Sequence, residues 1–114
     1  MSAIPKTLTA AAIRPIVLAT LACGEAYGYQ LSKRIEFISD GEIEWNAGTL
    51  YPVLHRLETE HLIEAVWRPS DSGPRRKYYR LTAIGEKAVD TEKAQWMKVH
   101  GVLVSLWQPD VSFG

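Results

Sequence analysis

The sequence is short of cysteine, of net charge and of long apolar runs. It holds a single cysteine, Cys23, so no internal disulfide can form, which is typical of a protein kept in the reducing cytoplasm. The apolar stretch near the N-terminus is interrupted by Arg14 and Pro15, is too short to span a bilayer and lacks the features of a secretory signal. The 114 residues suffice for one small domain. We therefore expect a cytoplasmic protein that has no contact with a membrane.

The charges balance: 13 lysines and arginines face 13 aspartates and glutamates, so the formal net charge is zero. DNA-binding domains usually carry an excess of positive charge. A net charge of zero therefore makes a nucleic-acid partner less expected. It does not exclude one, because a bound molecule responds to the local field of a patch more than to the total charge.

The sequence contains no pattern typical of catalysis or of metal binding. His55, His61, His100 and Cys23 have no spacing that would place two metal ligands on one face. We find no nucleophile with a matching base, no phosphate-binding glycine loop and no paired carboxylates. We predict that the protein is not an enzyme and holds neither a metal nor a cofactor.

The first apolar block predicts a helix over Leu8–Cys23 that ends at Gly24. Pro15 lies inside this block, where it removes a backbone donor and clashes with the carbonyl four residues earlier. The helix is therefore either kinked at Pro15, or it begins near Arg14 after a separate turn.

Two further helices are expected before residue 60. One follows Gly28, and the other begins at a cap formed by Asn46 or Thr49. We expect one face of this third helix to be buried, because its apolar residues are spaced at i, i+3, i+4 and i+7: Leu50, Val53, Leu54 and Leu57.

The next segment has the pattern of a β-hairpin followed by a long helix. Ile63–Trp67 and Lys77–Leu81 are strand-like, and the turn-rich segment Pro69–Pro74 joins them. Thr82 is a suitable N-cap for the last helix. The expected fold is mainly α with a small β-hairpin.

The polar side of the third helix and the basic hairpin together predict a DNA-binding surface. A short helix that can enter the major groove, beside a basic wing that can meet phosphates, is the layout of a winged helix-turn-helix. The expected partner is double-stranded operator DNA. The candidate DNA-binding residues are Thr49, Tyr51, Pro52, His55 and Arg56 on the helix and Arg75, Arg76 and Lys77 on the wing. Tyr78 and Tyr79 should face opposite sides of the strand, so that one of them enters the core.

The last helix carries two rows of apolar residues spaced by seven. Such rows describe a seam that faces a partner helix. The candidate dimerisation residues are Val89, Trp96, Val99, Leu103 and Leu106. We divide the chain into a winged helix-turn-helix domain over 1–82, a C-terminal dimerisation helix over 83–108 within the same compact unit, and a tail over 109–114.

Several separated motifs occur in an order that resembles the PadR family of transcriptional repressors. They are Tyr27-Gly28-Tyr29-Gln30-Leu31, Gly48-Thr49-Leu50-Tyr51-Pro52, Arg56-Leu57-Glu58, Leu62-Ile63 and Arg76-Lys77-Tyr78-Tyr79-Arg80-Leu81-Thr82. The sequence is further similar to a multidrug-binding member of that family. This resemblance implies a homodimer whose last helix packs on the partner's first helix, and a central pore where two copies of Trp96 enclose a planar aromatic effector.

The resemblance implies a set of ligand-binding residues: Trp96, Ala11, Pro15, Val99 and His100. The chain also departs from the multidrug-binding member. His100 stands where that member has an acidic residue, Pro15 replaces an aliphatic residue, and His61 occupies a position that is usually glycine in the family. The ligand's charge is therefore open. Two alternatives also remain, a PadR-like repressor without a small-molecule ligand and a winged-helix module that binds protein.

Overall fold

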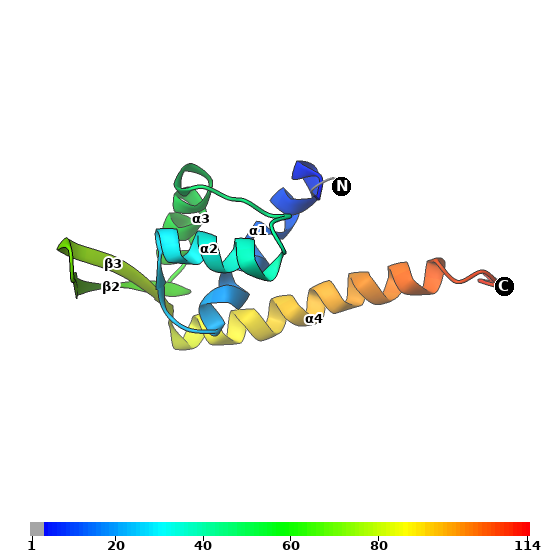
Figure 1. Cartoon of the computed structure of the whole chain (residues 1–114). Coiled ribbons are helices and arrows are strands. Elements are labelled where there is room, and N and C mark those ends of the chain that lie inside the picture. The colour runs from blue at the N-terminus through cyan, green and yellow to red at the C-terminus, as the bar shows by residue number, and fades with distance from the viewer. Residues whose placement is uncertain (1–3) are drawn as a thin grey trace.

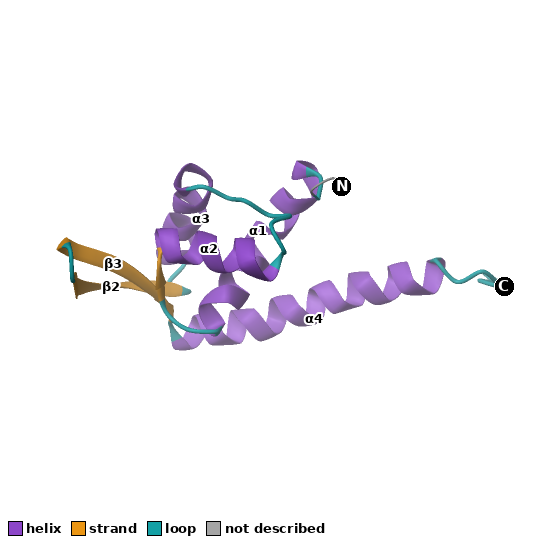
Figure 2. Cartoon of the chain, in the orientation of Figure 1, coloured by secondary structure: helices purple, strands orange, loops and turns teal. Residues whose placement is uncertain are grey.

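The computed structural model describes residues 4–114, which form four helices and a small antiparallel sheet (Figures 1 and 2). The first three residues of the expected domain 1–82 lie outside the described residues. In chain order the elements are α1 Lys6–Ala22, β1 Ala26–Tyr27, α2 Gly28–Ile38, α3 Ala47–Thr59, β2 Ile63–Ser70, β3 Gly73–Leu81 and α4 Ala83–Leu106. Helix α4 leaves the body formed by the other elements and projects along one side (Figure 1). The mainly helical winged-helix fold expected from the sequence is confirmed.

Helix α1 begins at Lys6, so the alternative in which it starts near Arg14 is wrong. Pro15 lies in the helix interior and withholds the hydrogen bond that the carbonyl of Ala11 would otherwise accept. The helix persists because its inner face is buried in the core through Val17, Leu18 and Leu21.

Helices α2 and α3 bury the residues that their periodicity indicates. Leu31 and Ile35 of α2 are buried against the stripe of α3. In that stripe Leu50, Leu54 and Leu57 are buried, and Val53 is half-buried. Asn46 is the N-cap of α3, because its side-chain oxygen accepts a hydrogen bond from the backbone N–H of Thr49 at 3.1 Å.

The sheet has a third strand that the sequence pattern did not predict. Its strand order is β1-β3-β2, and in the short strand β1 Ala26 pairs with Tyr79 and Tyr27 with Tyr78. The two residues of β1 are too few to show alternation in the sequence. The prediction for the tyrosines is confirmed: Tyr79 is buried, while Tyr78 lies on the other face against Tyr27, with ring centroids 5.2 Å apart.

The end of α3 is a Schellman turn centred on His61. The N–H of Leu62 donates to the carbonyl of Leu57 at 3.0 Å, and the N–H of His61 donates to Glu58 at 3.0 Å. His61 adopts a φ of 62°, the left-handed region that favours glycine. The backbone therefore keeps the turn that glycine would form most easily.

The start of helix α4 is hydrogen-bonded to the backbone of that turn. The N–H of Thr82 donates to the carbonyl of Leu62 at 3.0 Å, and the Thr82 hydroxyl donates to the carbonyl of His61 at 2.7 Å. The same hydroxyl accepts a hydrogen bond from the N–H of Gly85 at 3.0 Å, which confirms Thr82 as the N-cap. Gly85 is buried so closely on this turn that a Cβ atom would overlap the carbonyl oxygen of Leu62.

Two glycine-to-alanine substitutions in α4 should have opposite effects. We expect Gly85→Ala to lower the free energy of unfolding by about 1–3 kcal/mol, because the methyl group forces α4 away from Leu62. Gly101→Ala should raise it by about 1 kcal/mol, because position 101 is helical, exposed and open. Thermal unfolding of the two variants and the parent measures both effects, and equal responses would contradict the close packing at Gly85.

Candidate nucleic-acid interface

Helix α3 presents the five predicted helix residues on one exposed face. The apolar stripe fixes this orientation, because Leu50, Leu54 and Leu57 face the core and the remaining positions must face outward. All five outward side chains are exposed: Thr49, Tyr51, Pro52, His55 and Arg56. They combine hydroxyl groups, an imidazole and a guanidinium, which can all contact bases or phosphates.

Tyr51 is also in contact with the first turn of α2. A Cβ atom at Gly28 would lie 2.8 Å from the Tyr51 hydroxyl oxygen, so the absence of a side chain there lets the phenol reach α2. Between the starts of α2 and α3 lies a hollow of about 450 Å³. The α2 residues that line it are Gly28, Tyr29, Ser32, Lys33 and Glu36.

Tyr29, Ser32 and Lys33 were not among the candidate DNA-binding residues expected from the sequence. Their spacing of three and four places them on one side of α2, away from the buried Leu31 and Ile35, and that pattern could have identified them. Lys33 lies over the Tyr29 ring at 5.4 Å and pairs with Glu36 at 3.3 Å. They add hydroxyl and ammonium groups beside the exposed face of α3.

The three predicted wing cations occupy different environments. Arg75 is exposed and forms no ion pair with any described residue. Arg76 points to the opposite face of the strand and stacks over the Tyr27 ring at 4.6 Å. Lys77 is half-buried, lies over the Tyr79 ring at 5.2 Å and pairs with Glu58 of α3 at 3.6 Å.

These environments show that the wing is not a uniform cluster of free cations. Lys77 ties the hairpin to the helix beside it, and Arg76 stiffens the sheet through Tyr27. On the same outer face Arg68 donates to both carboxylate oxygens of Glu25, which holds the pKa of Glu25 below its usual value. Arg75 and Arg76 are both exposed and form no ion pair with a described residue, whereas Lys77 pairs with Glu58.

An ion-pair cluster around Arg14 connects three helices. Its Nη1 and Nη2 donate to Glu60 at the end of α3, at 3.0 and 2.7 Å, and its Nε donates to Glu92 of α4 at 3.0 Å. The hydrogen bond from Arg14 lowers the pKa of Glu60. Because α1 carries Arg14, the end of α3 is linked through α1 to the long helix.

Helix α4 leaves most of its apolar side uncovered. Val89 is half-buried, while the other predicted dimerisation residues are exposed: Trp96 (39 %), Val99, Leu103 and Leu106. Among the residues implied as ligand-binding, Ala11 and His100 are exposed and Pro15 is half-buried. Met97, Val102, Val104 and Trp107 are exposed as well, so the distal half of the helix is apolar on most sides.

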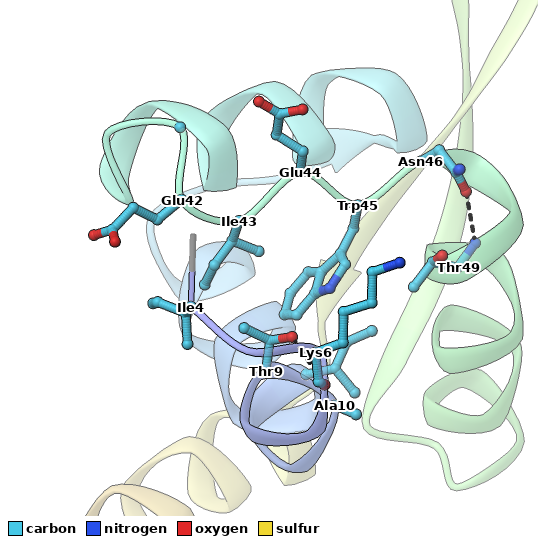
Figure 3. A pocket seen from close by; sticks show the side chains of 12 residues that line it. Ile4, Lys6, Thr9, Ala10, Glu42, Ile43, Glu44, Trp45, Asn46 and Thr49 are labelled. Carbon is cyan, nitrogen blue, oxygen red and sulfur yellow. Dashed lines mark hydrogen bonds between the residues drawn. The ribbon is translucent and has the colours of Figure 1, made fainter. Parts of the chain in front are cut away.

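A separate cavity of about 630 Å³ lies between the start of α1 and the segment before α3 (Figure 3). The Trp45 indole points into it, with Ile4, Thr9 and Ala10 nearby, and Glu44 points away (Figure 3). The cavity reaches Asn46 and Thr49, where α3 begins. It shares no residue with the surface around Trp96.

The described residues 4–114 bring together no group of three His, Cys, Asp or Glu side chains that could hold a metal ion. Cys23 is exposed at the end of α1, and its thiol donates to the carbonyl of Ala19 at 3.6 Å. Within the same part of the chain, no helix is both long and apolar enough to cross a membrane.

A buried helix pair whose second helix exposes polar side chains, followed by a two-stranded wing, defines a winged helix-turn-helix protein. The chain belongs to the PadR-like family of transcriptional regulators, whose family model matches residues 17–91. The family consists of transcriptional regulators and not of enzymes.

Comparisons with individual proteins agree with this assignment. The chain is 35% identical over 83 residues to a transcriptional regulator of Mycobacterium tuberculosis. The matched stretch covers 73% of this chain and 74% of that protein. It is similar to the structure of a Clostridium thermocellum transcriptional regulator, with a TM-score of 0.81, 28% identity and coverage of 92% and 99% of the two chains. It shares the fold of Bacillus subtilis PadR, which was crystallised in complex with operator DNA. In that comparison the TM-score is 0.62 and the identity 22%, over 69% of this chain and 45% of that one.

Proposed function

We propose that this protein is a dimeric repressor that binds double-stranded operator DNA and responds to a planar small molecule bound between its two copies. The single observation that carries the DNA-binding part is the exposed polar face of α3, held outward by the buried Leu50, Leu54 and Leu57 and flanked by the wing. The operator complex of the PadR relative supports the same partner.

In this proposal α3 enters the major groove. Thr49, Tyr51 and Pro52 lie near its start and contact or flank base edges, while His55 and Arg56 contact bases or phosphates. The start of α2 contributes phosphate contacts through Tyr29, Ser32 and Lys33, which line the hollow beside α3.

The wing contacts the flanking phosphates through Arg75, Arg76 and Lys77, and their environments give these residues different roles. Arg75 has free donors and binds phosphate directly. Arg76 also stacks on Tyr27 and Lys77 also pairs with Glu58, so these two residues position the wing as well as attract DNA. A formal net charge of zero is compatible with this interface, because the field at the wing is local.

Replacing the wing cations should weaken DNA binding and its dependence on salt. We expect Arg75→Ala to reduce the slope of log K against log[salt] by about 0.9, the value of one lost phosphate contact. The triple variant Arg75→Ala/Arg76→Ala/Lys77→Ala should fold and lose much more affinity. Lys98→Ala, which removes an exposed cation from distal α4, is the matched control. Fluorescence anisotropy with DNA from upstream of the protein's own gene measures the slopes, and an unchanged slope for Arg75→Ala would reject the wing assignment.

The homodimer is proposed from the uncovered apolar side of α4. A helix that is hydrophobic on most sides is normally buried, and the body of one chain covers only the first part of α4. A second copy supplies the missing cover through the seam of Val89, Trp96, Val99, Leu103 and Leu106. Residues 1–82 then act as the DNA-reading head, residues 83–108 as the dimerisation segment and residues 109–114 as a tail.

Charged residues in this seam should break the dimer. We expect Val99→Glu/Leu103→Glu to give a monomer or an unfolded chain, because association would bury carboxylates without partners. Met97→Glu, on a neighbouring side of the same helix, is the comparison variant and should perturb assembly less. Sedimentation equilibrium measures the mass, and a folded, dimeric double variant would show that the interface lies elsewhere.

The ligand site is proposed from Trp96 and from the likeness to the multidrug-binding repressor LmrR. Two copies of α4 related by a two-fold axis bring two Trp96 rings to one central site. Ala11 and Pro15 of α1 and Val99 and His100 of α4 complete its walls. Two indole faces stack on a planar ring, and each aromatic pair contributes about 0.5–1.5 kcal/mol beyond the burial of apolar area.

Ligand and operator would be coupled through the spacing of the two DNA-reading heads. A planar molecule between the α4 helices favours one separation, and the operator favours another. The Arg14 cluster supports such coupling, because it links α4 to the end of α3. The ligand can change the affinity for DNA only if it binds the two separations of the heads with different affinities, and the change cannot exceed that difference.

Trp96→Ala should weaken the binding of a planar aromatic dye and leave the dimer and the DNA affinity largely intact. By symmetry one substitution removes both stacking faces, so a loss of at least tenfold in dye affinity, about 1.4 kcal/mol, is expected. Trp107→Ala, at the end of α4 and outside the two rows, is the control. Isothermal titration calorimetry measures the affinities, and a Trp96→Ala variant that binds the dye as tightly as the parent would reject the ligand site.

A further inference from the structure

The charges around Trp96 are set by its neighbours one turn away on α4. Side chains three and four positions apart share a helix face, so Glu92, Lys93, Val99 and His100 surround the indole. Ala11 and Pro15, the α1 residues of the proposed ligand site, are uncharged. The local electrostatics therefore depend on Glu92, Lys93 and His100, and on any group paired with them.

The Glu92 carboxylate is already occupied. Arg14 donates its Nε to Glu92 Oε2 at 3.0 Å, and only 16% of the Glu92 side chain is exposed. Arg14 cannot easily turn away, because its other two nitrogens are held by both carboxylate oxygens of Glu60. The guanidinium is thus fixed between α4 and the end of α3, and its charge lies against Glu92.

The remaining charges leave no net attraction for a cation. The cluster of Arg14, Glu60 and Glu92 carries one negative charge, and Lys93 balances it. Lys93 is exposed and forms no ion pair among residues 4–114. His100 carries an imidazole and so supplies no negative charge. A cationic ligand would lose its hydration near Trp96 and find no free carboxylate in return.

We propose that the effector site selects uncharged planar aromatic molecules, and that Arg14 sets this preference by neutralising Glu92. The inference rests on the proposed ligand site at Trp96 and names the class of molecule that the site accepts. Removing Arg14 frees the Glu92 carboxylate one helical turn from the stacking surface. The substitution should therefore create an affinity for cations that the parent lacks.

The test compares two tricyclic probes of similar size: phenazine, which is uncharged, and 9-aminoacridine, which is a cation near neutral pH. Calorimetry at about pH 7.5 and low salt gives the ratio of the two affinities for the full-length parent and three variants. We expect the parent to favour phenazine. Arg14→Gln should shift the ratio toward 9-aminoacridine by about tenfold, as a carboxylate at this range would in a partly shielded site.

Two variants separate the charge effect from a general disturbance of the fold. Arg14→Gln/Glu92→Gln lacks the freed carboxylate, so its ratio should return to that of the parent. Glu60→Gln removes the other partner of Arg14, keeps the Arg14–Glu92 pair and frees no carboxylate, so its ratio should not shift toward 9-aminoacridine. Circular dichroism and sedimentation confirm that each variant is folded and has the mass of the parent.

The outcomes distinguish the two levels of the proposal. If neither probe binds the parent in a manner that Trp96→Ala weakens, the ligand site itself is wrong. If the probes bind at Trp96 but the parent favours 9-aminoacridine, or if Arg14→Gln leaves the ratio unchanged, the ligand site stands and the selection by Arg14 is overturned. A similar shift in the Arg14→Gln/Glu92→Gln variant would equally overturn the role of Glu92.

Discussion

The backbone around Leu62 determines how the helical body, the sheet and the long helix are joined. The N–H of Leu62 closes the end of α3, its carbonyl accepts from Thr82, and Gly85 packs against that carbonyl. Within a few residues one helix ends, the hairpin begins and the last helix starts. Because position 85 leaves no room for a side chain, the first turn of α4 lies directly against this junction. The exposed face of α3 and the apolar side of α4 are therefore placed relative to each other by backbone contacts.

The two halves of α4 have different surroundings. Near its start the helix packs on α1, and Arg14 pairs with Glu92. Beyond Trp96 it carries a nearly continuous apolar surface that one chain leaves open. Burying such a surface is the main favourable contribution to association. A second copy that covers it would also bring two DNA-reading heads into one particle, so the helix that would form the dimer and the ligand site would also set the spacing of the heads.

The net charge of zero does not mean that every surface is neutral, because several of the cations pair with glutamates and others do not. Five cations pair with glutamates within the described residues: Arg14, Lys33, Arg68, Lys77 and Arg80. The Lys33 pair lies within α2 and the others join segments that are distant in the sequence, and surface ion pairs add little to stability individually. The cations left without such partners include Arg56 and Arg75, on the two elements expected to meet DNA. A total of zero charge therefore coexists with a local positive surface.

The sequence by itself determined the elements whose signal is periodic or tied to a cap. The stripe of α3, the cap at Thr82 and the alternation of Tyr78 and Tyr79 all follow from side-chain chemistry within a few residues, whereas the structure decided between Asn46 and Thr49 as the cap of α3. Motifs of the same kind identified the family. Only the tertiary structure decided the rest, because it depends on which distant groups meet. β1 is a strand only because β3 lies beside it, and α1 continues through Pro15 because its inner face is buried. Lys77 meets Glu58, and Arg14 meets both Glu60 and Glu92, over separations of up to 78 residues that no local pattern records.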